Sequence, residues 1–505
     1  MSRMRFSSHT IPLAQAGLAM LLAGGMLAGT ATAALCPKED RGVYPASPLA
    51  LTVTAGGTFI DPDFGTTIMR VTDASDSADN HIAYSYWPTF NKDDTYFHIN
   101  RGGAAYLYHF DPTHMKILGK EPLFSKKTPY GTYPGWEDST WSATDPNVLL
   151  AHEGPRLWGW NVVTKTYSLI KDFGAELPAG IGIAQMSRSL DDNVFGFTQK
   201  RYSAPWDVVG YGAWKRDTNE LKLNTTTTQL DEVQVDKSGR YLVIKTGLQG
   251  AGAIEVKIAD LQTGGIQNLT DNGPDYAPGH SDNGYGMVVG ADNWRDVVTG
   301  RQLATPHTQY TVLNYNSDWS QEYHISMLAD GDQWAVLSLT LSSTTLHSSG
   351  VFKNEIIMVA TDGSQRVIRL AHHRTDYVDT RNYWDLPMAN ISRDGRFIAY
   401  TSNWDNSGRR DVFILRVPIF GDADMNGLVD MADYVLWFNN YGRSGGVGWD
   451  KGDWNADGQV DMADYVLWFN NYGQDIYGTG AAVPEPAVAA MLAAALGMRM
   501  IRRRK

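Results

Sequence analysis

The segment SRDGRFIAY (residues 392–400) joins a polar turn to an apolar stretch that begins at Phe397. Ser, Asp and Gly favour a tight turn, and the apolar residues after them favour a buried β-strand. Six other segments of the chain show the same order of turn and strand. The seven turns are centred near Asp93, Asp145, Asp192, Ser238, Asn283, Asp330 and Asp394, with steps of 45 to 64 residues between neighbours. The chain between Cys36 and Pro418 is therefore a repeat of strand-and-turn units.

A second hairpin follows most of these turns, as in AAYLYHFDPTHMKIL (104–118) and EIIMVATDGSQRVIRL (355–370). Two hairpins make a four-stranded blade, and seven such units predict an all-β, seven-bladed β-propeller over residues 36–418. The last unit, which ends in DVFILRV (411–417), lacks an outer strand. The orphan strand TTIMRVTD (66–73) is expected to close the ring there. The turns resemble those of the TolB/WD40-like repeats, which implies the fold alone.

The phrase VDMADYVLWFNNYG occurs twice near the end of the chain, at residues 429–442 and 460–473. Each copy completes a twelve-residue loop with oxygen-bearing residues at positions 1, 3, 5, 9 and 12, a glycine at position 6 and a backbone carbonyl at position 7. This spacing suits a hard cation such as Ca²⁺. The predicted calcium ligands are Asp422, Asp424, Asn426, Leu428, Asp430 and Asp433 in the first loop, and Asp453, Asn455, Asp457, Gln459, Asp461 and Asp464 in the second.

One helix follows each loop, no helix precedes it, and position 12 is Asp. Two such units resemble the type I dockerin, which implies a small all-α domain over residues 421–474 that binds two Ca²⁺ ions and docks to a cohesin-like partner. Met431-Ala432 and Met462-Ala463 stand where cellulosomal dockerins place hydroxyl-bearing recognition residues. The apolar helix faces suit either a docking surface or an intramolecular core.

Both ends of the chain have the composition of targeting segments. Residues 1–33 combine Arg3 and Arg5 with an apolar run and a small-residue cleavage site, as in a secretory signal peptide. Residues 483–505 resemble a PEP-CTERM sorting tail, which implies processing by an exosortase and export to the surface or matrix of a Gram-negative bacterium. Residues 475–482 would be a linker. Cys36 is the one cysteine of the chain, so no disulfide can form within it.

Composition and missing motifs narrow the possible functions. The formal net charge of −12 makes nucleic acid an unsuitable partner. The sequence contains no phosphate-binding glycine loop, no G-x-S-x-G and no HExxH motif. The pair His372–His373 has no third ligand in helical phase and is predicted to lie on the surface.

Long aromatic and polar segments precede the inner strands of the predicted blades, where they would line the mouth of the central channel. The candidate substrate-binding residues there are Trp136, Glu137, His280, His324, Trp384 and Asp385. Each also has a structural alternative, such as a histidine that braces a blade or a tryptophan that packs the rim. Oligogalacturonate lyases are seven-bladed propellers with channel histidines that hold a metal, but this likeness concerns the fold and assigns no residue here.

The sequence is compatible with two functions. The first is an exported protein whose propeller binds a polysaccharide or protein while the dockerin anchors it. The alternative is an extracellular polysaccharide hydrolase or lyase with its active site on the channel rim. Several histidines and acids converging at the rim would favour the enzyme, and an aromatic plug would favour the binder.

Overall fold

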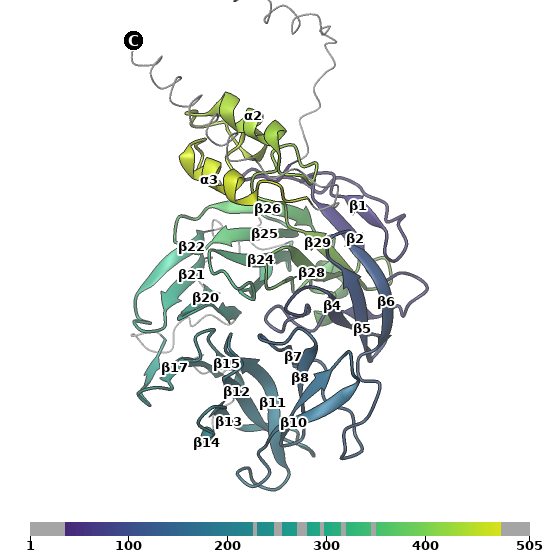
Figure 1. Cartoon of the computed structure of the whole chain (residues 1–505), viewed down its shortest axis with the longest axis vertical. Coiled ribbons are helices and arrows are strands. Elements are labelled where there is room, and N and C mark those ends of the chain that lie inside the picture. Colours follow the sequence, from purple (N-terminus) through teal and green to yellow (C-terminus); the bar gives the residue numbers. More distant parts are fainter. Residues whose placement is uncertain are drawn as a thin grey trace, which may run out of the picture. The chain divides into compact units, whose positions relative to one another are not determined.

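The computed structural model describes residues 36–225, 230–246, 255–269, 280–292, 297–314, 320–344 and 350–475. Within these ranges the chain forms seven antiparallel sheets, which follow one another as blades around a common axis (Figure 1). The prediction of an all-β, seven-bladed propeller is confirmed.

Blades 1 to 3 each follow the chain from the inner strand to the outer one. Blade 1 contains β3 (Asn80–His81), β4 (Tyr96–Arg101), β5 (Ala104–Asp111) and β6 (Lys116–Pro122). Blade 2 contains β7 (Thr140–Trp141), β8 (Val148–Glu153), β9 (Arg156–Asn161) and β10 (Thr166–Asp172). Blade 3 contains β11 (Ile181–Arg188), β12 (Val194–Arg201), β13 (Val208–Lys215) and β14 (Glu220–Thr225).

Blades 4 to 6 have the same order. Blade 4 contains β15 (Leu230–Val235), β16 (Tyr241–Thr246), β17 (Glu255–Asp260) and β18 (Ile266–Asn268). Blade 5 contains β19 (Ser281–Asn283), β20 (Met287–Asp292), β21 (Val297–Gln302) and β22 (Gln309–Asn314). Blade 6 contains β23 (Gln321–Ser326), β24 (Trp334–Leu341), β25 (Glu355–Ala360) and β26 (Val367–His372).

Blade 7 is built from both ends of the propeller sequence. It contains β27 (Asn390–Ile391), β28 (Phe397–Ser402), β29 (Asp411–Arg416), β2 (Thr67–Arg70) and β1 (Thr58–Ile60). Met69 pairs with Ile414 and Arg70 with Phe413, so β2 closes the ring beside β29 as the sequence predicts. The additional outermost strand β1 was not predicted from the sequence.

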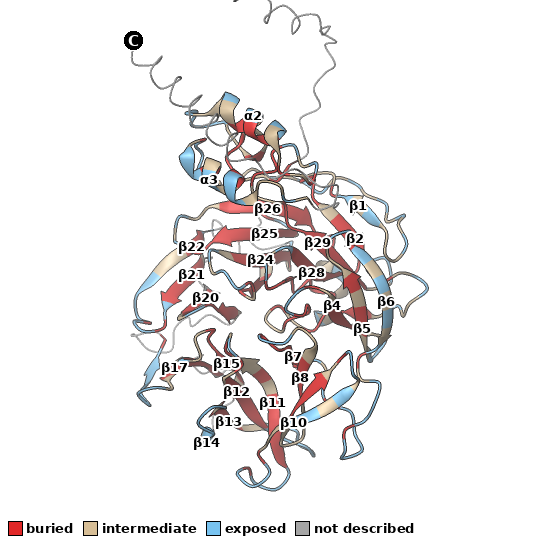
Figure 2. Cartoon of the chain, in the orientation of Figure 1, coloured by how far each residue is buried: buried red, intermediate tan, exposed pale blue. Residues whose placement is uncertain are grey.

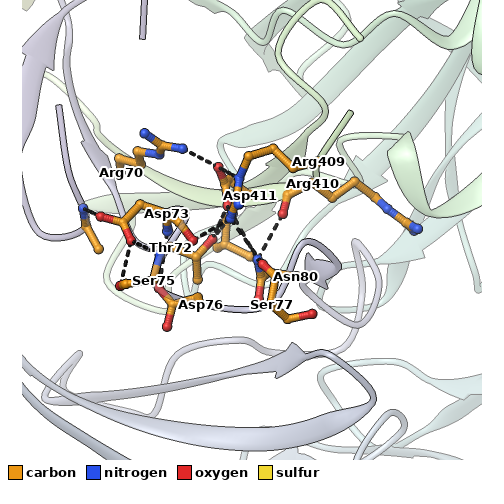
Figure 3. A network of polar contacts seen from close by, with 12 residues as sticks. Arg70, Thr72, Asp73, Ser75, Asp76, Ser77, Asn80, Arg409, Arg410 and Asp411 are labelled. Atoms are coloured by element: carbon orange, nitrogen blue, oxygen red, sulfur yellow. Dashed lines mark hydrogen bonds and ion pairs between the residues drawn. The ribbon is translucent and has the colours of Figure 1, made fainter. Parts of the chain in front are cut away.

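A buried polar network lies beside this closure (Figure 3). Asp411, at the start of β29, binds Nη2 of Arg70 at 2.6 Å and Nη2 of Arg409 at 2.6 Å, and it accepts a hydrogen bond from the Thr72 hydroxyl at 2.8 Å. Asn80 of blade 1 donates to the carbonyl of Arg410 at 3.0 Å. The network therefore ties the two ends of the propeller sequence to blade 1.

The turn between β27 and β28 shows why the repeat needs Ser, Asp and Gly. Gly395 has a φ of +80°, in the left-handed region that glycine adopts without strain. The hydroxyl of Ser392 donates to Asp394 at 2.9 Å and accepts from the backbone of Phe397 at 3.1 Å. The turn is closed by its own side chains, and the apolar strand β28 then runs into the core.

Burial differs strongly between outer strands (Figure 2). Residues along β6 alternate between exposed and half-buried, whereas all six residues of β26 are buried. The N-terminal strap (residues 36–64) covers β26: Lys38 pairs with Arg369, and Tyr44 and Asp63 bind His372. His372 and His373 are therefore buried rather than on the surface, which corrects the prediction for this pair.

The helices of the described chain are few and short. Two precede blade 7: α1 (Tyr377–Thr380) and the 3-10 helix η1 (Tyr383–Asp385). The C-terminal module (residues 421–475) contains α2 (Met431–Asn440), η2 (Trp449–Lys451) and α3 (Met462–Asn471). Among the described residues, no helix is long and apolar enough to cross a membrane. The predicted signal peptide and sorting tail lie outside the described residues.

Candidate functional site

Two of the candidate histidines meet at the inner ends of blades 5 and 6. The rings of His280 and His324 stack with their centroids 4.6 Å apart, and Tyr84 packs edge-on against His324 at 5.2 Å. His324 is 1% exposed, and neither ring nitrogen has a hydrogen-bond partner among the described residues. Buried polar groups are normally satisfied, so these nitrogens indicate a position where water or a ligand binds.

Burial keeps both imidazoles neutral at pH 7. It lowers the pKa of His280 to about 4, with a further contribution from Lys245. Burial and the neighbouring His280 hold the pKa of His324 well below its ordinary value. A neutral imidazole can bind a metal or accept a proton, but a pKa this low makes it a weak base, so the pair is better suited to ligation than to proton removal.

A buried chain of charged and phenolic groups adjoins the two histidines. The Tyr86 hydroxyl donates to Glu232, and Lys245 pairs with the other oxygen of that carboxylate. Lys245 also donates to the carbonyl of Ser281 at 3.1 Å. Burial and Glu232 raise the pKa of Tyr86 well above its ordinary value, so the phenol stays protonated. The histidine pair and this chain, together with Tyr84, are called the channel-mouth cluster below.

A second group of candidates gathers around His81. Its ring stacks on Trp384 at a centroid distance of 4.3 Å and lies 6.0 Å from Trp136. Nε2 of His81 lies 2.5 Å from Nδ2 of Asn100, and Nδ1 lies 2.9 Å from the carbonyl of Ile82. Because both ring nitrogens have partners, His81 braces two tryptophans that form part of the rim.

The acidic candidates have separate roles. Glu137 is exposed, while its neighbour Asp138 is buried and lies 2.8 Å from Nε2 of His152. Burial opposes ionisation of Asp138, but His152 and hydrogen bonds outweigh it and lower the pKa. Asp385 pairs with Arg410 at 3.2 Å and accepts from Asn403, so it supports the loop before blade 7. Glu137 and Asp138 differ in burial and partners, so they do not act as one acid–base pair.

Sequence reasoning expected aromatic and polar segments before the inner strands but did not single out Tyr84 or Tyr86, and it missed Glu232 and Lys245. Glu232 lies on β15 and Lys245 on β16, within strands that read as ordinary blade strands. A signal was available, because a lysine and a glutamate at facing positions of two otherwise buried strands indicate an internal ion pair.

The two predicted calcium loops fold alike. In the first, Asp422 accepts from the backbone of Gly427 at 2.8 Å and Asp433 accepts from that of Ala423 at 2.8 Å. In the second, Asp453 accepts from Gly458 at 2.9 Å and Asp464 from Trp454 at 2.9 Å. Gly427 and Gly458, at position 6 of each loop, have φ values of +83° and +80°. Glycine is required there because the loop turns through the left-handed region.

Buried carboxylates crowd each loop. Burial, followed by neighbouring carboxylates, raises the pKa of Asp422 to about 7, and burial raises those of Asp433 and Asp453 to about 6 and that of Asp464 to about 7. Oxygens of Asp422, Asp424 and Asp433 lie within 4.8 Å of one another, as one ion would require. Asp430 and Asp461 also cap α2 and α3. The first loop therefore meets the requirement of a hard divalent cation, and the second shares its spacing with Asn455 in place of an aspartate at position 3.

The two loop–helix units bury each other through reciprocal contacts. The Trp437 indole donates to the carbonyl of Asp461 at 2.9 Å, and the Trp468 indole donates to that of Asp430 at 2.8 Å. Both indoles are at most 1% exposed, whereas Val435, Met462, Val466 and Phe469 are 44–52% exposed. The apolar faces thus divide between an internal core and an outer surface.

A second group of potential metal ligands in the described chain is Asp61, Asp63 and His372. Both ring nitrogens of His372 already have partners, Oδ2 of Asp63 at 3.0 Å and the carbonyl of Tyr44 at 2.9 Å. This group therefore fastens the N-terminal strap. The channel-mouth cluster is not among the three-ligand groups found in the described residues.

Comparison with known proteins supports the fold. No protein-family model and no curated sequence matches the chain. An oligogalacturonate lyase from Vibrio parahaemolyticus superimposes with a TM-score of 0.52 at 12% identity, over 72% of this chain and 98% of that one. An oligogalacturonate lyase in complex with manganese gives a TM-score of 0.53 at 12% identity, over 72% and 99%. At this identity the likeness shows that the chain shares the propeller fold of these enzymes.

Proposed function

We propose that this is an exported, extracellular protein whose C-terminal module binds two Ca²⁺ ions and docks to a cohesin-like partner, while the propeller binds a polysaccharide at its channel mouth. One observation carries the first part. Two loops of the same spacing, each with two buried aspartates at positions 1 and 12, have the same hydrogen-bond pattern. Bound Ca²⁺ would neutralise the crowded carboxylates and fix both loops.

Calorimetry on the full chain tests calcium binding. We expect two Ca²⁺ ions per chain. A double variant with Asp422→Ala and Asp433→Ala should bind one Ca²⁺ ion. A double variant with Asp453→Ala and Asp464→Ala should also bind one. Asp217→Ala, at an exposed carboxylate, is the control and should keep two. If the wild-type chain gives no calcium-dependent heat, calcium binding by the module is excluded.

Docking would use the outer surface of the two helices. Val466 and Phe469 lie on one face of α3 and are half exposed, so a partner can cover them. Binding of the full chain to immobilised cohesin domains should require Ca²⁺ and should be lost in Val466→Asp. Binding that survives both chelator and this variant would exclude the helices as the docking surface.

The second candidate function is catalysis on a polysaccharide, and the histidine pair favours it. His280 and His324 converge with Glu232 and two tyrosines, which is the arrangement expected of an enzyme rather than of an aromatic plug. A neutral histidine held close to a sugar ring has the lone pair needed to remove a proton from it, the first step of eliminative cleavage, although its lowered pKa makes it a weak base. The likeness to oligogalacturonate lyases points to uronate-rich polysaccharides.

A substrate screen separates binding from catalysis. The full chain would be incubated with pectic, alginate-type and neutral polysaccharides, while binding and the release of shortened products are followed. We expect His324→Ala to abolish product release and His114→Ala, an exposed histidine of blade 1, to leave it unchanged. Binding without product release would show that the propeller binds these polymers without cleaving them. If neither binding nor product release is observed, both functions are excluded for these polymers.

A further inference from the structure

The C-terminal module packs against the propeller. The described chain from Cys36 onward forms one compact unit, and residues of the module and of blades 6 and 7 share one apolar core. Trp437, Trp449 and Trp468 of the module belong to this core together with Ile368 of β26 and Phe413 of β29. Calcium loops and blade strands are thus parts of a single packed region.

A direct hydrogen bond joins blade 6 to the second loop. Arg366, in the turn before β26, donates from Nη1 to the backbone carbonyl of Asn455 at 2.6 Å. Asn455 occupies position 3 of that loop. The same guanidinium pairs with Asp362 at 2.8 Å and lies 5.8 Å from the ring centroid of Trp334. Arg366 is therefore held by blade 6 and reaches the backbone that must surround an ion.

An aromatic chain joins the propeller to the first loop. Trp334 packs against Phe420 at 6.2 Å, and Phe420 packs against Trp449 at 5.5 Å. The Trp449 indole then donates to the carbonyl of Asp422, position 1 of the first loop, at 2.6 Å. Both loops are consequently connected to the same blade, the second through the guanidinium of Arg366 and the first through three aromatic rings packed at tilted angles.

The N-terminal strap contacts the module on the same side. Cys36 is buried and belongs to the same apolar core as Trp449 of η2. Two residues further along the strap, Lys38 pairs with Arg369 of β26. The strap therefore lies against both β26 and the segment that leads into the second loop.

We infer that calcium binding by the module and packing of the module on blade 6 are coupled, with Arg366 positioning the second loop for its ion. The inference rests on the calcium binding proposed above. Without an ion, the buried carboxylates of a loop repel one another and the loop backbone loosens. The hydrogen bond between Arg366 and the carbonyl of Asn455 would then break, and the packing of the module on β26 would weaken. By linkage, contacts that favour the closed loop raise its affinity for calcium, and calcium in turn stabilises blade 6.

Calcium titration of the full chain tests the coupling directly. We expect Arg366→Ala to weaken one of the two sites by about 5- to 20-fold, within the range of ordinary coupling energies. Arg240→Ala is the control, because Arg240, like Arg366, pairs with an aspartate, Asp260 at 2.9 Å, but lies on blade 4. It should bind both ions with wild-type affinity. Equal affinities in all three proteins would overturn the inference.

Hydrogen exchange on the wild-type chain gives a test that needs no substitution. Exchange of the β26 amides should slow at least several-fold when Ca²⁺ replaces chelator, because local opening of blade 6 becomes harder. Exchange in β6, the outer strand of blade 1 with exposed and half-buried residues, should stay the same. If two ions bind and β26 does not respond, the coupling is excluded while calcium binding stands. If no ion binds, the proposed function itself fails.

Discussion

Strands β6 and β26 occupy the same place in their blades but have different surroundings. Both are outermost strands, yet β6 alternates between exposed and half-buried residues and every residue of β26 is buried. The N-terminal strap and the C-terminal module cover β26, whereas the outer face of β6 meets solvent. An outer strand is an edge that other chains can pair with, and cover protects it. Blade 6 thus serves as an attachment point for both ends of the described chain.

Breaking the buried ion pair under the strap should give the largest difference in the free energy of unfolding between the covered blade 6 and a blade whose outer strand meets solvent. Arg369 donates to Glu355 at 2.7 Å, and both side chains are fully buried. Arg369→Ala would leave Glu355 buried and uncompensated, at a cost of about 3–5 kcal/mol in the free energy of unfolding. Urea unfolding of the full chain measures it.

The matched control for this prediction is Arg156→Ala on blade 2. Arg156 pairs with Asp172 of the outer strand β10 at 3.0 Å, and the two side chains are 23% and 36% exposed. Exposed pairs contribute about 1 kcal/mol or less. Equal losses in the two variants would show that the strap does not exclude water from blade 6.

Truncation of an apolar side chain compares β26 with β6 without changing any charged residue. Ile368 of β26 is 1% exposed, whereas Leu118 of β6 is 63% exposed. Ile368→Ala should lower the free energy of unfolding by about 2–4 kcal/mol, because it removes buried methyl groups and leaves a cavity. Leu118→Ala should change it by less than about 0.5 kcal/mol. A loss below about 1 kcal/mol for Ile368→Ala in urea unfolding would contradict the burial of β26.

Part of this contrast could be predicted from the sequence. The stretch VIRLAH of β26 has four apolar residues, whereas KILGKEP of β6 contains two lysines and a glutamate. The polar residues Arg369 and His372 hid the burial of β26, and His372 was predicted to lie on the surface. The seven turns and the orphan strand that became β2 also followed from spacing. The doubled loops followed from carboxylate spacing alone, although their ions remain a prediction.

The identity of what covers β26 could not be predicted. The strap has no regular strand or helix before β1, so periodicity says nothing about its course, and the bridge between Lys38 and Arg369 spans most of the propeller sequence. The pairing of His280 with His324 depends likewise on two loops that enter neighbouring blades. Such contacts form only when the ring closes, so the local sequence does not predict them.

The smallest expected effect is on the folding stability that is lost at low pH, compared between blade 6 and blade 1. His373, directly after β26, is fully buried; Nε2 donates to the carbonyl of Leu339 at 2.9 Å and Nδ1 accepts from the backbone of Thr375 at 3.0 Å. Burial lowers its pKa to about 3, despite the opposing hydrogen bond. A lowered pKa means that the contribution to stability is present above about pH 6.5 and is lost as the pH falls towards the folded-state value.

His373 should therefore account for about 1–2 kcal/mol of the stability lost between pH 7.5 and 5, because the unfolded chain takes up a proton that the folded chain excludes. In urea unfolding at both values of pH, His373→Gln should show a correspondingly smaller loss than the wild-type chain. His114→Gln, at a residue that is 57% exposed beside β6, should lose as much as wild type. If His373→Gln keeps the full loss, His373 is protonated or reached by water in the folded protein, and the cover over the end of β26 is open.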